Sequence, residues 1–212
     1  MCWNAEVSLQ TFIVSSMGLA TLYYLDYDNI IITLIFSFVF MQLIEFFMWI
    51  YIKKPKISRY FGVLSLILVL LQPIILLYFT QYSVYIWLYV LLQFIICIIC
   101  VFFFGLTWAS FDFVPKVAKN GHLRWNWFHN KYLFAFSALI YFVFFIGTLY
   151  LTHTPAFIIA LGTLLFSSYN YGMYGTFSSM WCWIANICII FALIHALILL
   201  KPFIITDINL SI

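Results

Sequence analysis

Glu45 is the residue of this chain whose type and position most clearly suggest chemistry. It lies inside the run 30–52, which is otherwise almost wholly apolar. An ionised group at the centre of a membrane helix costs about 2.5–3.5 kcal/mol on insertion scales, so it normally faces a protein interior or a water-filled cavity. Two interpretations stay open: Glu45 binds a proton or a cation, or it joins helices through hydrogen bonds.

Other polar residues are predicted to share a cytoplasmic-facing cavity with Glu45. Gln42 and Trp49 lie on the same face of its helix by their spacing. In the last apolar run, Cys182 and Asn186 share a face in the same half of the membrane. The residues predicted to line the cavity are Glu45, Gln42, Trp49, Gln72, Cys182, Asn186 and Glu6.

The sequence predicts no catalytic centre, no metal site and no cofactor. A nucleophile with a base and an orienting group is not visible in it. Cys97 and Cys100 have the spacing of a redox pair, but they lie in mid-span, whereas a reactive thiolate is stabilised at a helix N-terminus. An enzyme is therefore the least favoured class of function.

The elements that must position these residues are membrane helices. Of the 212 residues, 67% are hydrophobic and 7% are charged, whereas soluble domains are about 45–50% apolar and 25% charged. Continuous apolar runs of about 20 residues recur, as a bilayer span requires. We predict an all-α membrane protein, a seven-transmembrane helix bundle forming a single domain over 1–212, with helices at about 6–24, 30–52, 60–79, 84–104, 132–151, 156–171 and 177–200.

The long loop 105–131 is predicted to carry a small β-hairpin at about 113–127. Asn120-Gly121 between alternating segments is the signal of a type I′ turn. Tryptophans suit the headgroup region of a membrane, and basic side chains attract anionic lipid headgroups. The predicted interfacial residues of the loop are Trp108, Lys116, Lys119, Arg124, Trp125 and Trp127.

The basic residues also set the orientation. Every Lys and Arg except Lys201 lies in the loops 53–59 and 105–131, which seven spans place on the same side as the N-terminus. Because basic loops stay in the cytoplasm, the N-terminus is predicted to be cytoplasmic and the C-terminus extracellular or lumenal. These charges lie in two loops that directly adjoin spans, so the expected partner is the bilayer and not nucleic acid.

Three short segments carry a resemblance to a known family. They are the start, Met-Cys-Trp-Asn-Ala-Glu-Val-Ser, the loop segment 121–127, Gly-His-Leu-Arg-Trp-Asn-Trp, and the segment 179–186, Ser-Met-Trp-Cys-Trp-Ile-Ala-Asn. With these motifs the chain resembles an uncharacterised family of small multi-pass membrane proteins of algae and large DNA viruses. The resemblance implies a multi-pass architecture and no particular activity.

Three functions remain open from the sequence. The leading hypothesis is a carrier or channel for a small solute or ion, with Glu45 as the protonatable or cation-binding group. The alternative is a non-enzymatic receptor, scaffold or viral membrane component, with the basic hairpin as its partner surface. The third is a lipid-modifying enzyme that uses Glu45 and Cys182 or a histidine.

Overall fold

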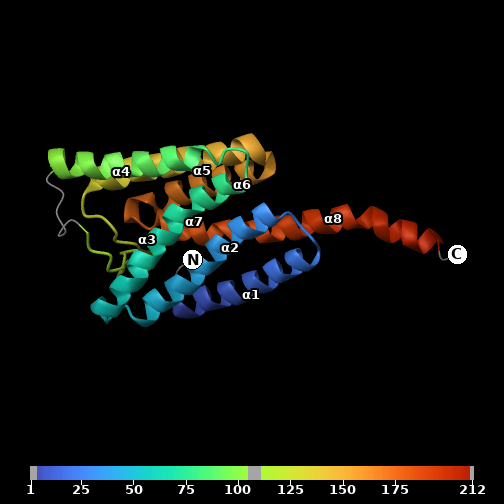
Figure 1. The fold of residues 1–212 in the computed structure, drawn as a ribbon. Coiled ribbons are helices and arrows are strands. Elements are labelled where there is room, and N and C mark those ends of the chain that lie inside the picture. The colour runs from blue at the N-terminus through green and yellow to red at the C-terminus, as the bar shows by residue number, and fades with distance from the viewer. Residues whose placement is uncertain (1–3, 105–110, 211–212) are drawn as a thin grey trace.

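Long helices joined by short turns make up most of the structure (Figure 1). This computed structural model describes residues 4–104 and 111–210, with side chains at 4–103, 111–130 and 132–198. In Figure 1, α4, α5 and α6 lie along one side of the molecule and α1 lies along the other. The helices are α1 (Ala5–Tyr24), α2 (Asn29–Ile50), α3 (Pro55–Tyr78), α4 (Tyr85–Phe104), α5 (Lys131–Thr152), α6 (Thr154–Tyr171), α7 (Phe177–Ala185) and α8 (Ile187–Leu210), with a 3₁₀ turn, η2 (Gly172–Tyr174), before α7.

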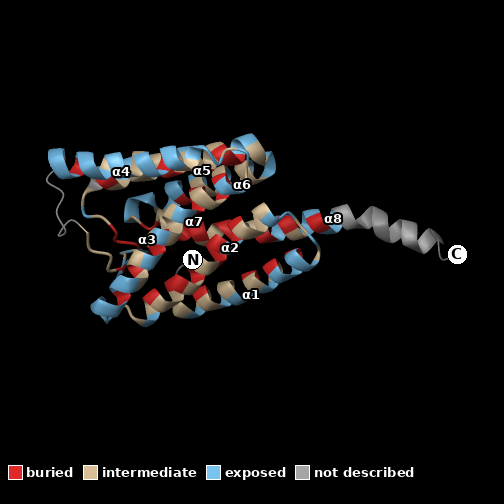
Figure 2. Cartoon of the chain, in the orientation of Figure 1, coloured by how far each residue is buried: buried red, intermediate tan, exposed pale blue. Residues whose placement is uncertain are grey.

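The helix that carries Glu45, α2, is the central helix of the molecule. Half of its most apolar stretch is buried within the protein, against 11% for α4, and Figure 2 shows the same contrast. It packs against α1, α3 and α7. The side chains of Gln42 and Glu45 lie on its buried face and have no exposed surface. Because Glu45 faces the protein interior, its carboxylate does not incur the free-energy cost of contact with lipid.

The described part of the chain contains six helical segments that are long and apolar enough to cross a membrane. One of them, 177–198, combines α7 with the first half of α8, and α1 is not among the six. Large apolar side chains such as Trp87 and Phe102 on α4 are about four-fifths exposed, as a surface that faces lipid requires. The chain is therefore an integral, multi-pass, all-α membrane protein, and a seventh span at 6–24 stays a prediction.

The predicted last span, 177–200, differs from the structure in two ways. First, it is divided at Asn186, whose backbone N–H donates to the carbonyl of Trp183 instead of Cys182. The side-chain amide of Asn186 donates to that Cys182 carbonyl at 2.9 Å, which explains why an asparagine is stable at the break. Second, α8 continues past the predicted end to Leu210.

The predicted hairpin is present, but its turn is of a different type. Strands β1 (Lys116–Val117) and β2 (Leu123–Arg124) pair antiparallel. The N–H of Gly121 donates to the carbonyl of Ala118 at 2.9 Å. Gly121 has a φ of 79°, whereas Asn120 has no positive φ. The N–H of Ala118 also donates to the carbonyl of His122 at 2.9 Å, which leaves residues 119–121 as the loop. A type I′ turn needs a positive φ at both central residues, so this is instead a three-residue loop that ends in a left-handed glycine.

The two faces of the hairpin loop have opposite environments. Leu123, Trp125 and Trp127 are buried in the main hydrophobic core with residues of α2, α3, α5 and α7. The two tryptophans thus pack within the protein, because the hairpin inserts its apolar face into the end of the bundle, and their place at the level of the headgroups stays a prediction. The basic residues Lys116, Lys119 and Arg124 are exposed, as the prediction requires. Trp108 lies outside the described residues.

The loop also makes a close backbone contact with α3 at Gly62. A Cβ atom added to Gly62 would lie 1.8 Å from the carbonyl oxygen of Phe113. Only a residue without a side chain fits at such a distance. Gly62 therefore allows the first part of the loop to lie directly on α3.

Candidate functional site

Glu45 connects the central helix to the hairpin loop. The indole Nε1 of Trp125 donates to Glu45 Oε1 at 3.0 Å. The ring of Trp125 stacks on that of Trp127 with 4.9 Å between their centroids, and Trp127 Nε1 donates to Ser65 Oγ of α3 at 3.0 Å. The stacked indoles thus join the loop to α2 and α3, and this supports the interpretation that Glu45 joins elements through hydrogen bonds.

The hairpin also bonds to the chain around α7. Ser179 Oγ donates to the carbonyl of Leu123 at 2.7 Å, and Asn120 Nδ2 donates to Thr176 Oγ1 at 3.0 Å. The rings of His122 and Tyr171 meet edge to face, 5.5 Å apart. Two of the segments that carry the family resemblance, 121–127 and 179–186, are therefore in direct contact.

A charged cluster holds the base of the hairpin together outside the helices. Lys116 Nζ donates to Asp112 Oδ2 at 2.9 Å, and Asn126 Nδ2 donates to the same oxygen. Burial alone would raise the pKa of Asp112, but the hydrogen bonds from Lys116 and Asn126 and the positive charge of Lys116 hold this pKa below its usual value. Asp112 is therefore ionised at neutral pH.

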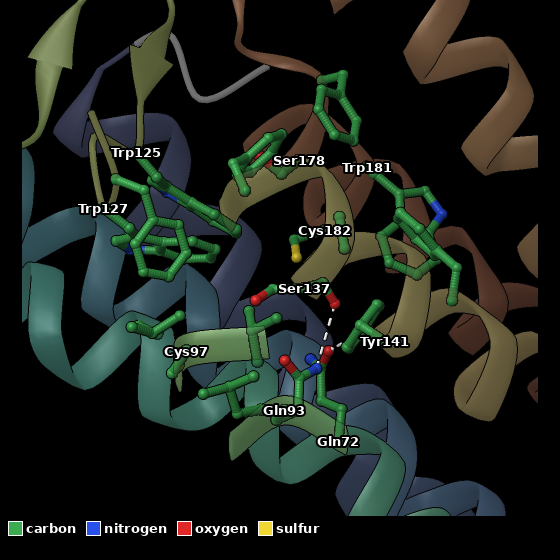
Figure 3. A pocket seen from close by; sticks show the side chains of 18 of the residues that line it. Gln72, Gln93, Cys97, Trp125, Trp127, Ser137, Tyr141, Ser178, Trp181 and Cys182 are labelled. Atoms are coloured by element: carbon green, nitrogen blue, oxygen red, sulfur yellow. Dashed lines mark hydrogen bonds between the residues drawn. The ribbon is translucent and has the colours of Figure 1, made fainter. Parts of the chain in front are cut away.

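An inner cavity of about 350 Å³ lies between α3, α4, α5, α7 and the hairpin loop (Figure 3). The name inner cavity is used below only as a label for the cavity that is lined in part by the hairpin loop. Most of its wall is aromatic or aliphatic. The residues that line it are Leu66, Val69, Leu70, Gln72, Gln93, Phe94, Cys97, Phe111, Trp125, Trp127, Phe128, Phe134, Ser137, Ala138, Tyr141, Phe142, Phe177, Ser178, Trp181 and Cys182.

Uncharged polar groups gather on one part of this cavity wall, as Figure 3 shows. The hydroxyl of Tyr141 donates to Gln72 Oε1 at 2.6 Å, and Gln93 Nε2 donates to the carbonyl of Ser137 at 3.2 Å. The Nε2 atom of Gln72 is buried with no hydrogen-bond partner among the described residues. None of the described lining residues is Asp, Glu, Lys, Arg or His. The cavity thus suits an uncharged molecule.

The structure corrects the predicted cavity around Glu45. Gln72 and Cys182 line the inner cavity, whereas Glu45 is sealed among side chains. Gln42 and Asn186 are also buried away from it, and each has an amide atom without a partner in the described part of the chain. A carboxylate can be buried without a cavity where it accepts a hydrogen bond, and Glu45 accepts one from the Trp125 indole.

Two further predicted residues, Trp49 and Glu6, do not line the inner cavity either. The Trp49 indole N–H is buried and has no partner within the described residues. Glu6 is exposed near the start of α1, where its carboxylate accepts from Gln10 Nε2 at 3.1 Å. The buried polar residue near this end of α1 is instead Ser8.

An outer cavity of about 400 Å³, which the sequence did not predict, lies between α2, α5, α6 and α8 at the other end of the bundle. Tyr27, His153 and His195 are among the residues that line it. The Tyr27 hydroxyl is 3.0 Å from His195 Nδ1, and His153 Nε2 is 3.5 Å from Asp28 Oδ2. These polar residues come from turns and a helix far apart in the chain, so no local pattern identifies them as a group.

Trp181 lines both cavities. Its ring packs edge to face against Phe38, Phe142 and Phe145, with centroids 5.6–5.8 Å away, and its Nε1 donates to Thr163 Oγ1 at 3.1 Å. Aromatic contacts of this kind fix a ring in one orientation. Trp181 is therefore the wall that the inner and outer cavities share.

Known proteins offer no template for this arrangement. No protein-family model matches the chain, and neither does any curated protein or any solved structure. The resemblance to the algal and viral family thus stays a prediction. Within the described residues, no group of three or more His, Cys, Asp or Glu could hold a metal ion.

Proposed function

We propose that the protein is a membrane receptor that binds a small, uncharged and largely apolar molecule and reports it through the hairpin. The observation that carries the proposal is the double role of Trp125 and Trp127. Both line the inner cavity, and both form the buried face of the loop whose other face is basic and exposed. A molecule in the inner cavity would therefore contact the hairpin loop, whose basic face is exposed on the surface of the protein.

The cavity favours an apolar molecule over an ion. Its volume falls in the range of about 300–1,000 Å³ found for pockets that hold small molecules. Desolvating an ion against a wall without charges is strongly unfavourable, and Glu45 is sealed. An uncharged apolar solute dissolves in lipid without help, so a cavity that holds it is better suited to sensing than to transport.

A larger side chain at position 138 should remove this binding site. Ala138 lines the inner cavity, so Ala138→Phe is expected to fill empty space without disturbing the fold. In nanodiscs, benzophenone should photolabel cavity peptides of the native protein and slow tryptic cleavage at Lys116 and Lys119. We expect both effects to fall at least fivefold in Ala138→Phe, as for the loss of about 1 kcal/mol of binding.

The control is Leu139→Phe on the same helix, since Leu139 is 59% exposed. It should label and cleave like the native protein. Labelling that Ala138→Phe leaves unchanged would disprove binding in the inner cavity. Labelling that depends on position 138, without any change in cleavage, would disprove the reporting role of the hairpin.

A carrier is the second candidate, and the shared wall at Trp181 is the observation that favours it. A molecule that passes this ring would move from one cavity to the other. The carrier then predicts benzophenone adducts in both cavities, with those of the outer cavity lost in Ala160→Phe, because Ala160 lines it. It predicts no change in the cleavage of the hairpin.

The orientation belongs to the same proposal, with the hairpin in the cytoplasm and its basic face on anionic lipid. Ile13, Val14 and Met17 of α1 are exposed and apolar, which supports α1 as a seventh span that turns its polar residues inward. In a variant without native cysteines, Lys119→Cys should resist a membrane-impermeant maleimide in intact cells and react after permeabilisation. Asp26→Cys should react in intact cells, and the reverse pattern would invert the orientation.

A further inference from the structure

The side-chain amide of Gln72, which lines the inner cavity, has a hydrogen-bond donor without an acceptor among the described residues. Its Oε1 accepts the hydroxyl of Tyr141 at 2.6 Å, which sets the direction in which the amide faces. Its Nε2 carries two donor hydrogens and has no partner among the described residues, although no part of the side chain is exposed. Because a buried donor without an acceptor is unfavourable, the group is suited to a ligand atom that accepts.

The surroundings of Gln72 limit what that atom belongs to. The part of the cavity wall that the structure describes has no charged residue to pair with a carboxylate or an amine. Rings of Phe94, Phe134 and Phe142 form much of the wall, together with Trp125 and Trp127. Aromatic rings pack best against other rings in stacked or edge-to-face contacts. The wall therefore favours an uncharged ligand that contains a ring.

We propose that the inner cavity binds a ring-bearing ketone or quinone whose carbonyl oxygen accepts a hydrogen bond from Gln72 Nε2. The inference rests on the proposed function and names the class of its ligand. A carbonyl oxygen only accepts, so it complements an amide N–H that only donates. Tyr141 is a positioning residue, because its hydroxyl holds the amide with its nitrogen free.

The test uses benzophenone, an aromatic ketone that attaches covalently to nearby C–H bonds under ultraviolet light, with the full chain in nanodiscs. The main variant is Gln72→Leu with Tyr141→Phe, since removing both partners of a buried hydrogen bond leaves neither group unsatisfied. The matched control is Gln81→Leu, an exposed glutamine in the turn after α3. Adducts on the peptide that contains residues 134–142 are counted by mass spectrometry.

We expect the double variant to lose labelling of this peptide by roughly tenfold and the control to keep it. Dicyclohexyl ketone should compete with benzophenone about tenfold better than dicyclohexylmethane, which lacks the oxygen. If Ala138→Phe removes the labelling but the double variant and the two competitors make no difference, the carbonyl preference is wrong and the apolar binding site stands. If Ala138→Phe has no effect, the binding site itself is wrong.

Discussion

Replacement of Glu45 by alanine is expected to lower the free energy of unfolding by about 3 kcal/mol or more. The change leaves the buried indole N–H of Trp125 without its acceptor, which costs about 1–3 kcal/mol. It also empties space in a core helix, and truncations of large buried side chains to alanine cost about 2–5 kcal/mol. Thermal unfolding in detergent, followed by tryptophan fluorescence, should show the loss, together with faster tryptic cleavage of the hairpin.

Glu45→Gln is the informative comparison, because glutamine keeps an oxygen that can accept from Trp125 but carries no charge. It is expected to retain stability to within about 1 kcal/mol. Glu6→Ala, at an exposed carboxylate on α1, should change stability by no more than about 0.5 kcal/mol. A glutamine variant as unstable as the alanine variant would show that the charge itself is required and would restore the cation-binding interpretation of Glu45.

Replacement of Gly62 by alanine is expected to detach the hairpin loop from α3. The new methyl group would lie 1.8 Å from the carbonyl oxygen of Phe113, and a backbone atom cannot give way as a flexible side chain can. Inserting a methyl group into well-packed structure typically costs about 1–3 kcal/mol, and we expect the upper end of this range. Protease cleavage between residues 111 and 128 should accelerate, and benzophenone labelling of the inner cavity should fall.

Gly147→Ala is the matched control, since a Cβ atom at this glycine of α5 meets nothing within 4 Å. In a helix interior this exchange should raise stability by about 0.5–1 kcal/mol. If Gly62→Ala unfolds at the same temperature as the native protein, the close contact between α3 and the loop is not present in solution.

The helices and the hairpin follow from local sequence, and the contacts between them do not. Apolar runs of about 20 residues indicate membrane spans whatever contacts those spans make. The Asn-Gly pair indicates a hairpin, although the turn observed is not the type I′ turn that the pair favours. Trp125, which donates a hydrogen bond to Glu45, lies 80 residues away from it in the sequence. Nothing near Glu45 indicates that its acceptor oxygen will meet the indole of Trp125.

The burial of Trp125 and Trp127 within the protein could not be predicted from their residue type. An indole has an apolar ring and one N–H donor, so it suits both the membrane interface and a core that offers an acceptor. The pattern in 123–127 does contain a signal, because Leu123, Trp125 and Trp127 alternate with Arg124 and Asn126. Such alternation indicates a segment with one buried face, and the sequence alone does not show what covers that face.

The hydrogen bond between Trp125 and Glu45 also has a consequence for how the chain is made. Synthesis proceeds from the N-terminus, so α2 is complete long before the indole that bonds its carboxylate exists. During that interval this particular hydrogen bond cannot form. The stacked indoles of Trp125 and Trp127 therefore join α2 only when residues 111–128 fold back onto helices that are already complete.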